Sequence, residues 1–350
     1  MMSESTKQTY AGAGVDTAAA DQLISRIASV AATARRPEVL SDVGPFAGLF
    51  RLGEYRDPVL IASTDSVGTK VKLASVLGRY EGVGHDLVNH CVNDILTSGA
   101  EPLFFLDYIG NFGLSDDQKV DLVRGVADAC RASGCALIGG ETADMPGTYA
   151  DGDYDLVGFI VGVAERESVI DGSEIEAGDA LIALPSNGLH TNGYSLVRRI
   201  FGTGLSAPGQ PTDPVAERAV LEEEYPELSL TLGDALLEPH RCYLGVLKPV
   251  LSKIRGFAHI TGGGLPGNVP RVFSAGLGPR IDRRSWEAPA IFKLIQERGE
   301  IADEEMFATF NMGVGAVLAV SPTDLDGLLG ELPGSWQIGE VVSGEGFRWA

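Results

Sequence analysis

Hydrophobic residues in the first half of the chain form short runs and one helical repeat. The run at 59–63 ends at Thr64-Asp65 and predicts a buried strand that enters a turn. Between 86 and 98, apolar residues recur at i, i+1, i+4, i+5, i+8 and i+9, which predicts an amphipathic helix. Ser115, followed by two acidic residues, predicts the start of another helix that reaches about 132. With strands expected at 103–109, 135–138 and 155–163, this half is β-α-β-α-β-β, a plait-like α+β unit.

A polar break at 171–173 separates this half from a second unit. That unit opens with a strand at 180–184, a polar loop at 185–193 and a helix. Residues 203–226 are rich in Pro and acids, and we expect a surface excursion there. Further elements are predicted at 243–254 (helix), 258–261 (strand), 312–320 (strand), 323–329 (helix) and 336–342 (strand).

We therefore expect three parts in the 350-residue chain. They are a partly flexible N-terminal segment (1–56), an N-terminal domain (57–170) and a C-terminal domain (171–345). Two domains agree with a typical size of about 150 residues each.

The chain is strongly acidic, with 27 Lys and Arg against 48 Asp and Glu and a net charge of −21. A field of this sign repels phosphate backbones and anionic lipid, which argues against nucleic-acid or membrane-surface binding. A phosphorylated ligand must then be held locally, by backbone N–H groups, a few cations or Mg²⁺. The longest apolar runs are far shorter than the roughly 20 residues that a bilayer span requires.

Two features favour a cytoplasmic protein. The first ten residues contain no hydrophobic segment of the kind found in secretory signals. The four cysteines form no CxxC pair, which favours reduced, buried thiols over a disulfide or a zinc site.

The segment Thr64–Lys70 (TDSVGTK) is the first candidate site. The Asp65 carboxylate at a strand end suits Mg²⁺, a hard ion that prefers oxygen ligands. The backbone N–H groups of Gly68 and Thr69 suit phosphate oxygens, and Lys70 adds a point charge. A solvated turn with an incidental ion pair is the alternative interpretation.

Acidic residues at two further positions extend this candidate. Asp94 lies near the apolar face of the helix predicted at 86–98, where a charge is costly unless it is paired or bound to a metal. Glu141 and Asp144 follow Gly139-Gly140 at the end of another predicted strand. Three acidic sites at the ends of three elements suit a divalent cation that bridges phosphate oxygens. Chance clustering among 48 acids is the competing explanation.

The second unit contributes a polar histidine and a run of glycines. His190 is flanked by Asn187, Thr191 and Asn192, all of which form hydrogen bonds. The segment Thr261–Gly264 (TGGG) precedes a predicted helix start, where exposed N–H groups suit an anion. His259, just before it, is equally explained as a core residue.

Ten segments together resemble the phosphoribosylformylglycinamidine cyclo-ligase family, also called aminoimidazole ribonucleotide (AIR) synthetase. The resemblance extends from about residue 9 to 342. The segments, in chain order, are Thr9–Asp16, Arg35–Leu40, Ser63–Lys70, Cys91–Ile95, Gly99–Tyr108, Gly139–Gly147, Ser186–Arg198, His259–Gly264, Asn268–Val272 and Phe310–Gly315.

The resemblance implies a fold, an assembly and a reaction. The N-terminal domain would be a ferredoxin-like plait that binds ATP and pairs with a second copy into a β-barrel, giving a homodimer. The C-terminal domain would be an α/β sandwich that closes over the substrate. The reaction would be ATP-driven ring closure of formylglycinamidine ribonucleotide to 5-aminoimidazole ribonucleotide through an iminophosphate, with release of ADP and phosphate, a step of purine biosynthesis.

The resemblance also implies roles for the candidate residues. Asp65, Asp94 and Glu141 would hold Mg²⁺, and Lys70 would meet the transferring phosphates. The loop Thr261–Gly264, with Asn192, would bind the substrate and its 5′-phosphate, and His190 would position the substrate or move a proton. The expected ATP-binding set is Asp65, Gly68, Thr69, Lys70, Asp94, Gly139, Gly140 and Glu141; the expected substrate set is His190, Asn192, Thr261, Gly262, Gly263 and Gly264.

Two other classes of protein remain as alternatives. One is another enzyme of the same superfamily, such as a thiamine-monophosphate kinase, a selenophosphate synthetase or a hydrogenase-maturation dehydratase. The last two use a reactive Cys or selenocysteine near one terminus, whereas the first cysteine here is Cys91. The other is a non-catalytic nucleotide-binding or scaffold protein, which would be expected to lack the metal-binding acids.

Overall fold

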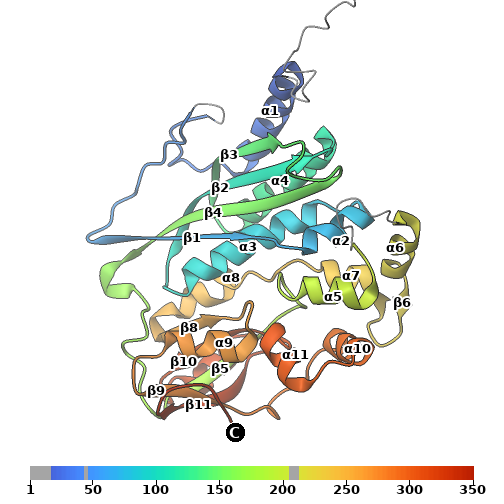
Figure 1. The fold of residues 1–350 in the computed structure, drawn as a ribbon. Helices are drawn as coiled ribbons and strands as arrows, with labels where there is room; N and C mark the ends of the chain where they lie inside the picture. Colours follow the sequence, from blue (N-terminus) through green and yellow to red (C-terminus); the bar gives the residue numbers. More distant parts are fainter. Residues whose placement is uncertain (1–16, 43–45, 205–212) are drawn as a thin grey trace, which may run out of the picture.

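The computed structural model describes residues 17–42, 46–204 and 213–350. The motif at 9–16 therefore lies outside the described residues. Figure 1 shows two sheets, one from each half of the chain, with helices between them. Among the described helices, none has both the length and the apolar character needed to cross a membrane.

The first half forms a four-stranded sheet in the order β1-β4-β2-β3. Strands β2 and β3 are parallel and the other neighbours are antiparallel. Helices α3 and α4 pack on one face, and α1 packs on α4. The elements are α1 (Thr17–Ala31), β1 (Pro58–Ser66), α2 (Lys70–Leu77), α3 (Glu81–Leu96), β2 (Glu101–Phe112), α4 (Asp116–Ala132), β3 (Ala136–Asp144) and β4 (Asp153–Glu165).

The predicted strands and helices of this half are present, with three differences. An additional helix, α2, begins at Lys70, so the order is β-α-α-β-α-β-β. Strand β1 continues past its predicted end to Ser66, so Asp65 lies in the last two residues of the strand, and β3 continues past 138 through Gly139–Glu141 to Asp144. The start of α4 is as predicted, because Ser115 and Gln118 form a reciprocal capping box.

The second half forms a six-stranded sheet in the order β12-β9-β11-β5-β10-β8, antiparallel except between β12 and β9. Its two faces belong to two different apolar clusters, because alternate residues of β5 point in opposite directions. The elements are β5 (Ala180–Pro185), α5 (Tyr194–Phe201), α6 (Pro214–Leu221), β6 (Glu224–Tyr225), β7 (Leu230–Thr231), α7 (Leu232–Leu237), α8 (Leu244–Leu247), β8 (Ile254–His259), α9 (Gly264–Asn268), β9 (Leu277–Ile281), α10 (Ala290–Gly299), α11 (Asp303–Thr309), β10 (Val314–Val320), α12 (Leu325–Glu331), β11 (Trp336–Ser343) and β12 (Arg348–Trp349).

Sequence patterns located most of these elements and misplaced others. The helix predicted at 243–254 is split into α8 and a 3₁₀ segment at Lys248–Lys253, where Pro249 removes a backbone donor. Strand β8 ends at His259, before the predicted end at 261. The elements that the sequence did not predict are α6, β6, β7, α7, β9, α10, α11 and β12.

Helix α3 lies between the two halves and is buried on nearly all sides (Figure 1). One face contributes Leu87, Cys91 and Ile95 to an apolar cluster that also includes residues of the second half.

Two glycines set the distance between α3 and α4. A Cβ on Gly84 would lie 2.6 Å from the Leu122 carbonyl oxygen, and one on Gly125 would collide with the Glu81 carbonyl oxygen. These glycines allow α3 and α4 to cross with their backbones in contact.

Candidate active site between the two halves

A cavity of about 460 Å³ opens between β1 and α3 on one side and β8 and α9 on the other. Asp65, His90, Asp94 and His259 line one part of its wall, and Thr261, Asn268 and Arg271 line another. Arg271 is the one Lys or Arg among the described residues that line this cavity. The cavity therefore has acidic and basic groups in one space.

The acidic part is built by β1 and α3. Ser63 and Asp65 alternate along β1 and point to the face that the helices cover. On α3, His90 and Asp94 share one face because they are four residues apart. His90 Nε2 lies 2.9 Å from Asp65 Oδ2 and 3.9 Å from Asp94 Oδ2, and Ser63 Oγ donates a hydrogen bond to Asp94 Oδ2 at 3.0 Å.

Three more histidines extend this cluster. His259 Nδ1 lies 2.9 Å from Asp94 Oδ1, and its Nε2 lies 3.0 Å from His240 Nε2. The ring of His240 stacks on that of His190, with centroids 3.9 Å apart and planes 20° from parallel. Together with His90, four of the five histidines of the chain lie in this one cluster.

Burial and neighbouring charges shift the pKa values in opposite directions. Burial alone would raise the pKa of Asp65 and Asp94, but hydrogen bonds and charge from His90 and His259 lower both below the usual range. Burial would lower the pKa of His90, but its hydrogen bond to Asp65 and the charges of Asp94 and Asp65 raise it. The two carboxylates are therefore ionised at neutral pH and available to a cation.

The pKa of His190 is well below its ordinary value, because burial and the neighbouring His259 oppose a positive charge. Its Nε2 lies 3.1 Å from Asn187 Oδ1, while its Nδ1 has no partner among the described residues. The backbone has φ of 63°, an unusual conformation for a non-glycine residue. His190 is 1% exposed and lies behind His240, not on the cavity wall.

The polar face of α3 fixes the segment that carries His240. Asp86 accepts a hydrogen bond from the His240 backbone N–H, and Asn89 donates to the His240 carbonyl. Asn93 donates to the Arg241 carbonyl and accepts from the Tyr243 N–H. The side chains of α3 thus satisfy the backbone of a segment about 150 residues away and position the histidine cluster.

The Lys70 side chain is fully buried and lies away from the cavity. Its Nζ forms an ion pair with Asp86 at 2.8 Å and donates to the carbonyl oxygens of His190 and Glu238 at 3.2 and 2.8 Å. An ammonium group has three donors, and here all three have partners inside the protein. In this structure Lys70 joins the two halves, and no donor is left for a phosphate.

Glu141 also lies away from the cavity. Strand pairing relates Glu141 to Tyr108, Val157 and then Ser66, and Gly140 to Asp107, Gly158 and then Asp65. Paired residues share a face, so Glu141 points to the face opposite Asp65, three strand spacings or about 14 Å across the sheet. Within one chain, Gly139, Gly140 and Glu141 are not brought to Asp65 and Asp94.

Gly68 and Thr69 lie between β1 and α2, outside the residues that line the cavity. Among the described contacts, their backbone N–H groups have no hydrogen-bond partner. Gly68 has φ of 68°, and a Cβ there would meet only open space. Thr69 Oγ1 lies 3.2 Å from Ser195 Oγ of α5, so this turn reaches the second half. These two donors are therefore available to an anion, and their role in binding one stays a prediction.

The glycine loop at 261–264 is held by Asn268. The Asn268 amide nitrogen lies 3.3, 3.1 and 2.8 Å from the carbonyl oxygens of Thr261, Gly262 and Gly264. Its Oδ1 accepts from Thr261 Oγ1 and from Arg271 Nη1, both at 3.3 Å. Asn268 thus holds three carbonyl groups of the loop from one side.

The N–H groups of Gly262 and Gly263 have no partner among the described residues, whereas that of Gly264 donates to the Thr261 carbonyl. Asn192 is a direct neighbour of this loop, since a Cβ on Gly262 would lie 3.1 Å from Asn192 Oδ1. The structure thus brings Asn192 and the loop together, as the sequence predicts, and adds Arg271.

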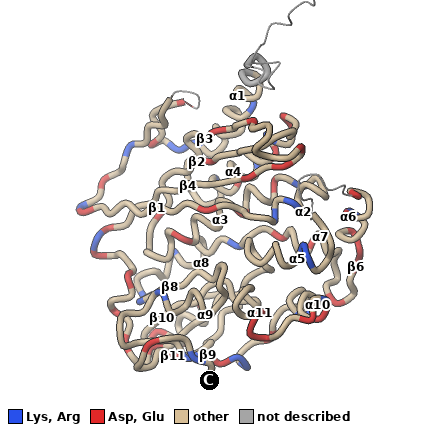
Figure 2. The backbone as a smooth tube through the Cα atoms, in the orientation of Figure 1, with Lys and Arg blue, Asp and Glu red and all other residues tan. Residues whose placement is uncertain are grey.

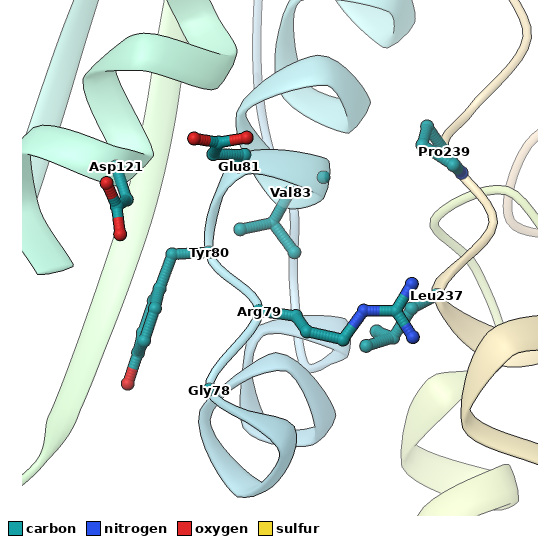
Figure 3. Close-up of a pocket in the computed structure, with 9 residues that line it drawn as sticks. Gly78, Arg79, Tyr80, Glu81, Val83, Asp121, Leu237 and Pro239 are labelled. Atoms are coloured by element: carbon teal, nitrogen blue, oxygen red, sulfur yellow. The ribbon is translucent and has the colours of Figure 1, made fainter.

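A second cavity, of about 350 Å³, lies near the start of α3 (Figure 3). It is lined by the stretch from Gly78 to Val83 together with Asp121, Leu237 and Pro239. Its one cation, Arg79, is already paired with Asp234 at 2.6 Å. None of the residues predicted for ATP or substrate lines it.

Sequence reasoning missed His90, His240, Asn268 and Arg271. His90 and Asp94 are four residues apart on a predicted helix, and that spacing was the available signal. Asn268 and Arg271 lie in the segment Asn268–Val272, which carries part of the family resemblance but gave neither residue a role. His240 has no local signal and reaches the site because side chains of α3 bind its backbone.

Two family models match most of the chain. Residues 47–164 match the N-terminal domain of AIR synthase related protein, and residues 176–349 match its C-terminal domain. The chain belongs to the AIR synthase related protein family. The cavity lies between these two domains, with β1 and α3 from the first and β8 and α9 from the second.

Curated relatives within the AIR synthase family share nearly half of the sequence. A phosphoribosylformylglycinamidine cyclo-ligase of Thermoanaerobacter is 44% identical over 342 residues, which cover 96% of this chain and 98% of the relative. The cyclo-ligase of Geobacillus thermodenitrificans is 48% identical over 349 residues, 97% of each chain.

Solved structures of two other proteins show the same fold at low identity. A thiamine-monophosphate kinase from Stenotrophomonas maltophilia aligns with a TM-score of 0.64 and 17% identity, covering 93% of this chain and 95% of that chain. The hydrogenase maturation protein HypE in complex with ATP aligns with a TM-score of 0.61 and 17% identity, covering 93% and 87%.

Proposed function

We propose that this chain is a phosphoribosylformylglycinamidine cyclo-ligase, which closes the imidazole ring of 5-aminoimidazole ribonucleotide at the expense of ATP. The observation that carries the proposal is the cavity itself. It combines two ionised carboxylates, Asp65 and Asp94, with a wall that contains Thr261, Asn268 and Arg271 and suits an anion. Relatives of nearly half identity over almost the whole length bear the name of this reaction.

The carboxylates fit Mg²⁺ bound to the phosphates of ATP. Asp65 and Asp94 have exposed oxygens in the cavity and pKa values below the usual range. Oxygen ligands of this kind suit Mg²⁺, which supplies charge neutralisation at transferring phosphates. The free N–H groups of Gly68 and Thr69 follow Asp65 along the chain and suit the same phosphates.

The glycine loop suits the 5′-phosphate of the ribonucleotide. Gly262 and Gly263 offer backbone donors, Arg271 offers a planar cation, and Asn192 offers an amide. A chain of net charge −21 needs such local donors to hold an anionic substrate. Asn268 acts as a positioning residue, since it orients the loop from behind.

The reaction needs little covalent chemistry from the protein. Transfer of the γ-phosphoryl group to the formyl oxygen gives an iminophosphate, whose C–O bond is far easier to break than that of the amide. Attack by the amidine nitrogen on the same carbon then forms the C–N bond and expels phosphate. The task of the protein is to hold the two phosphorylated reactants in register and neutralise charge.

For His190 we propose an indirect role. It is packed against His240, which contacts His259 on the cavity wall. This order supports a positioning residue for the histidine cluster and does not bring His190 into direct contact with substrate in this conformation. Lys70 we place with the fold rather than with the transferring phosphates, since its donors are all occupied.

We further propose a homodimer formed through the first sheet. The face of this sheet that α3 and α4 do not cover presents Leu60 and Phe159, which are 61% and 40% exposed. Exposed apolar side chains on one face of a sheet suit contact with a second copy of the chain. Glu141 points to this same face, so a metal role for it requires a second chain. The molecular mass in solution, by light scattering, tests the dimer.

A cytoplasmic location is supported by four free thiols.

The test of the reaction uses purified protein with ATP, Mg²⁺ and formylglycinamidine ribonucleotide. We expect ADP, phosphate and an aromatic amine, detected by diazo coupling, in equal amounts. Thiamine monophosphate in place of the ribonucleotide is the matched control, and phosphorylation of it would instead indicate the kinase. Absence of amine at saturating ATP and Mg²⁺ would overturn the proposal.

A further inference from the structure

The cluster on the acidic side of the cavity contains nitrogen donors as well as carboxylates. His90, Asp94 and His259 each place one donor atom within 4.8 Å of the other two, and Asp65 lies 2.9 Å from His90 Nε2. Donors around one ion at about 2.1 Å are separated by roughly 3 to 4 Å. His259 Nδ1 lies 2.9 Å from Asp94 Oδ1, and His90 Nε2 lies 3.9 Å from Asp94 Oδ2. Both separations fall near this range.

Each histidine is fixed through its other ring nitrogen. His90 Nδ1 lies 2.9 Å from Thr191 Oγ1, and His259 Nε2 lies 3.0 Å from His240 Nε2. Histidines that bind metals characteristically use the second nitrogen in such an outer hydrogen bond, which fixes the ring and its tautomer. Thr191 and His240 are themselves buried, so these supports are part of the interior.

The cluster also has an open side. All four residues line the 460 Å³ cavity, where water or a phosphate oxygen has room to complete the coordination. His90 and His259 are 4% and 6% exposed, so the rings are enclosed except towards the cavity. A closed shell on one side and an open position on the other is the arrangement of a site that binds an ion and a ligand together.

We propose that His90, Asp94 and His259, with Asp65 beside them, form a mixed nitrogen–oxygen site that binds a divalent transition ion such as Co²⁺ or Zn²⁺. Two imidazoles and carboxylate oxygens favour these borderline ions over Mg²⁺, which prefers oxygen ligands alone. The inference concerns the ion that this chain selects. It does not depend on the reaction proposed above.

One consequence is competition at the carboxylates. A transition ion held by the histidines would use Asp94 and Asp65, the residues proposed for Mg²⁺. Micromolar Zn²⁺ should therefore compete with Mg²⁺ for the full chain.

The direct test uses metal alone, without ATP or substrate. The full chain is stripped with a chelator and titrated with Co²⁺, followed by calorimetry and by the visible absorption of protein-bound Co²⁺. We expect one equivalent of tight binding with a spectrum typical of nitrogen ligation. His90→Gln and His259→Gln should each weaken Co²⁺ binding by more than about 10-fold and change the spectrum.

His85→Gln is the matched control, because His85 lies on the same helix outside the cluster and should bind Co²⁺ like the wild type. Unchanged Co²⁺ affinity in both His90→Gln and His259→Gln would overturn the proposal, as would the absence of Co²⁺ binding. Circular dichroism checks folding, and if His90→Gln does not fold, His259→Gln alone decides.

A second histidine group, His190, His240 and His259, also meets the distance requirement. Its rings at 190 and 240 are stacked nearly parallel, so their nitrogens do not converge on one point. His190→Asn, which suits the left-handed backbone there, distinguishes the two groups. Because His190 contacts the cluster only through His240, we expect this substitution to weaken Co²⁺ binding clearly less than His259→Gln does, and a loss as large as that of His259→Gln would overturn the assignment. Since no step uses ATP, failure here leaves the cyclo-ligase proposal standing.

Discussion

Two charged clusters on either side of helix α3 differ in what surrounds them. The Lys70–Asp86 pair is completely buried, and the lysine has three partners inside the protein. Asp65 and Asp94 keep side chains 41% and 26% exposed in the cavity. A buried charge with all its partners stabilises one arrangement of the two halves, whereas a charge with free lone pairs is available to a ligand.

This difference separates a structural charge from a functional one better than residue type does. From sequence, Asp65 and Lys70 belong to one motif and receive one role. In the structure they lie at opposite ends of the β1–α2 connection, and only Asp65 lines the cavity. Acidic residues occur along the chain in both halves (Figure 2), so residue type alone does not mark the functional ones.

The largest effect should come from breaking the closed pair. Lys70→Met leaves the Asp86 carboxylate uncompensated in the interior and should cost about 3–5 kcal/mol of unfolding free energy. Urea denaturation measures this loss. Lys72→Met is the matched control, because the pair of Lys72 with Asp153 is partly exposed and worth about 1 kcal/mol or less. If Lys70→Met keeps wild-type stability but loses turnover, Lys70 acts on the transferring phosphates and not in the fold.

Asp65→Asn should show the opposite behaviour. Loss of one carboxylate weakens charge neutralisation at the transferring phosphoryl group, and turnover should fall about 10²–10³-fold. The melting temperature and circular dichroism should remain near wild type, because Asp65 is half-exposed. Retention of more than about a tenth of the activity, a barrier change under roughly 1.4 kcal/mol, would remove Asp65 from the metal site.

Arg271→Gln tests the other side of the cavity. Loss of a charge-assisted hydrogen bond to phosphate, worth about 1.5–3 kcal/mol, should raise the KM for the ribonucleotide by roughly 10- to 100-fold and leave the KM for ATP unchanged. Steady-state kinetics with each substrate varied in turn measures both. Arg284→Gln is a control on the surface, where Arg284 pairs with Asp282. A rise confined to the KM for ATP would assign Arg271 to the ATP site and contradict its assignment to the ribonucleotide.

The smallest effect per residue concerns the pH dependence of stability. Burial lowers the pKa of His190, His240 and His259 in the folded chain, so the unfolded chain binds more protons once pH falls below the unfolded pKa of about 6.5. Each such histidine therefore removes up to about 1.4 kcal/mol per pH unit below that value. The raised pKa of His90 acts in the opposite sense, with a contribution that is lost as pH rises through its folded value.

We therefore expect the unfolding free energy to decrease as the pH is lowered from 7.5 to 5.5. The depressed pKa values of Asp65 and Asp94 add nothing in this window, because both carboxylates stay ionised until far lower pH. His240→Gln should flatten the dependence when unfolding is measured in urea at several pH values. An equal slope in His240→Gln and wild type would show that His240 does not titrate on unfolding.

Periodicity predicted the parts of the fold where one apolar face decides the structure. The helix expected at 86–98 and the capped helix after Ser115 are present as α3 and α4. What periodicity could not show is that the polar face of α3 is also buried. Asp86 and Asn93 look like solvent-facing residues until their partners are known.

The candidate site was predicted to a similar extent. Asp65, Asp94 and Thr261 lie in one cavity because a strand end, a helix and a loop meet there. Glu141 does not join them, since a motif records its order in the chain but not the face of the sheet to which it points. His240 lies in the same site through contacts between distant segments, for which the sequence has no local sign.

Gly84 and Gly125, where α3 and α4 cross, should be sensitive positions in a genetic selection. Any other residue at either position would push α3 and α4 apart, and α3 bears His90 and Asp94 on the cavity wall. If the reaction is the one proposed, substitutions at these two glycines should appear in selections for purine auxotrophy. Conditional alleles that grow only at low temperature should be found there, remote from any bound substrate. The crossing of two helices would then define a locus as sensitive as the site that it supports.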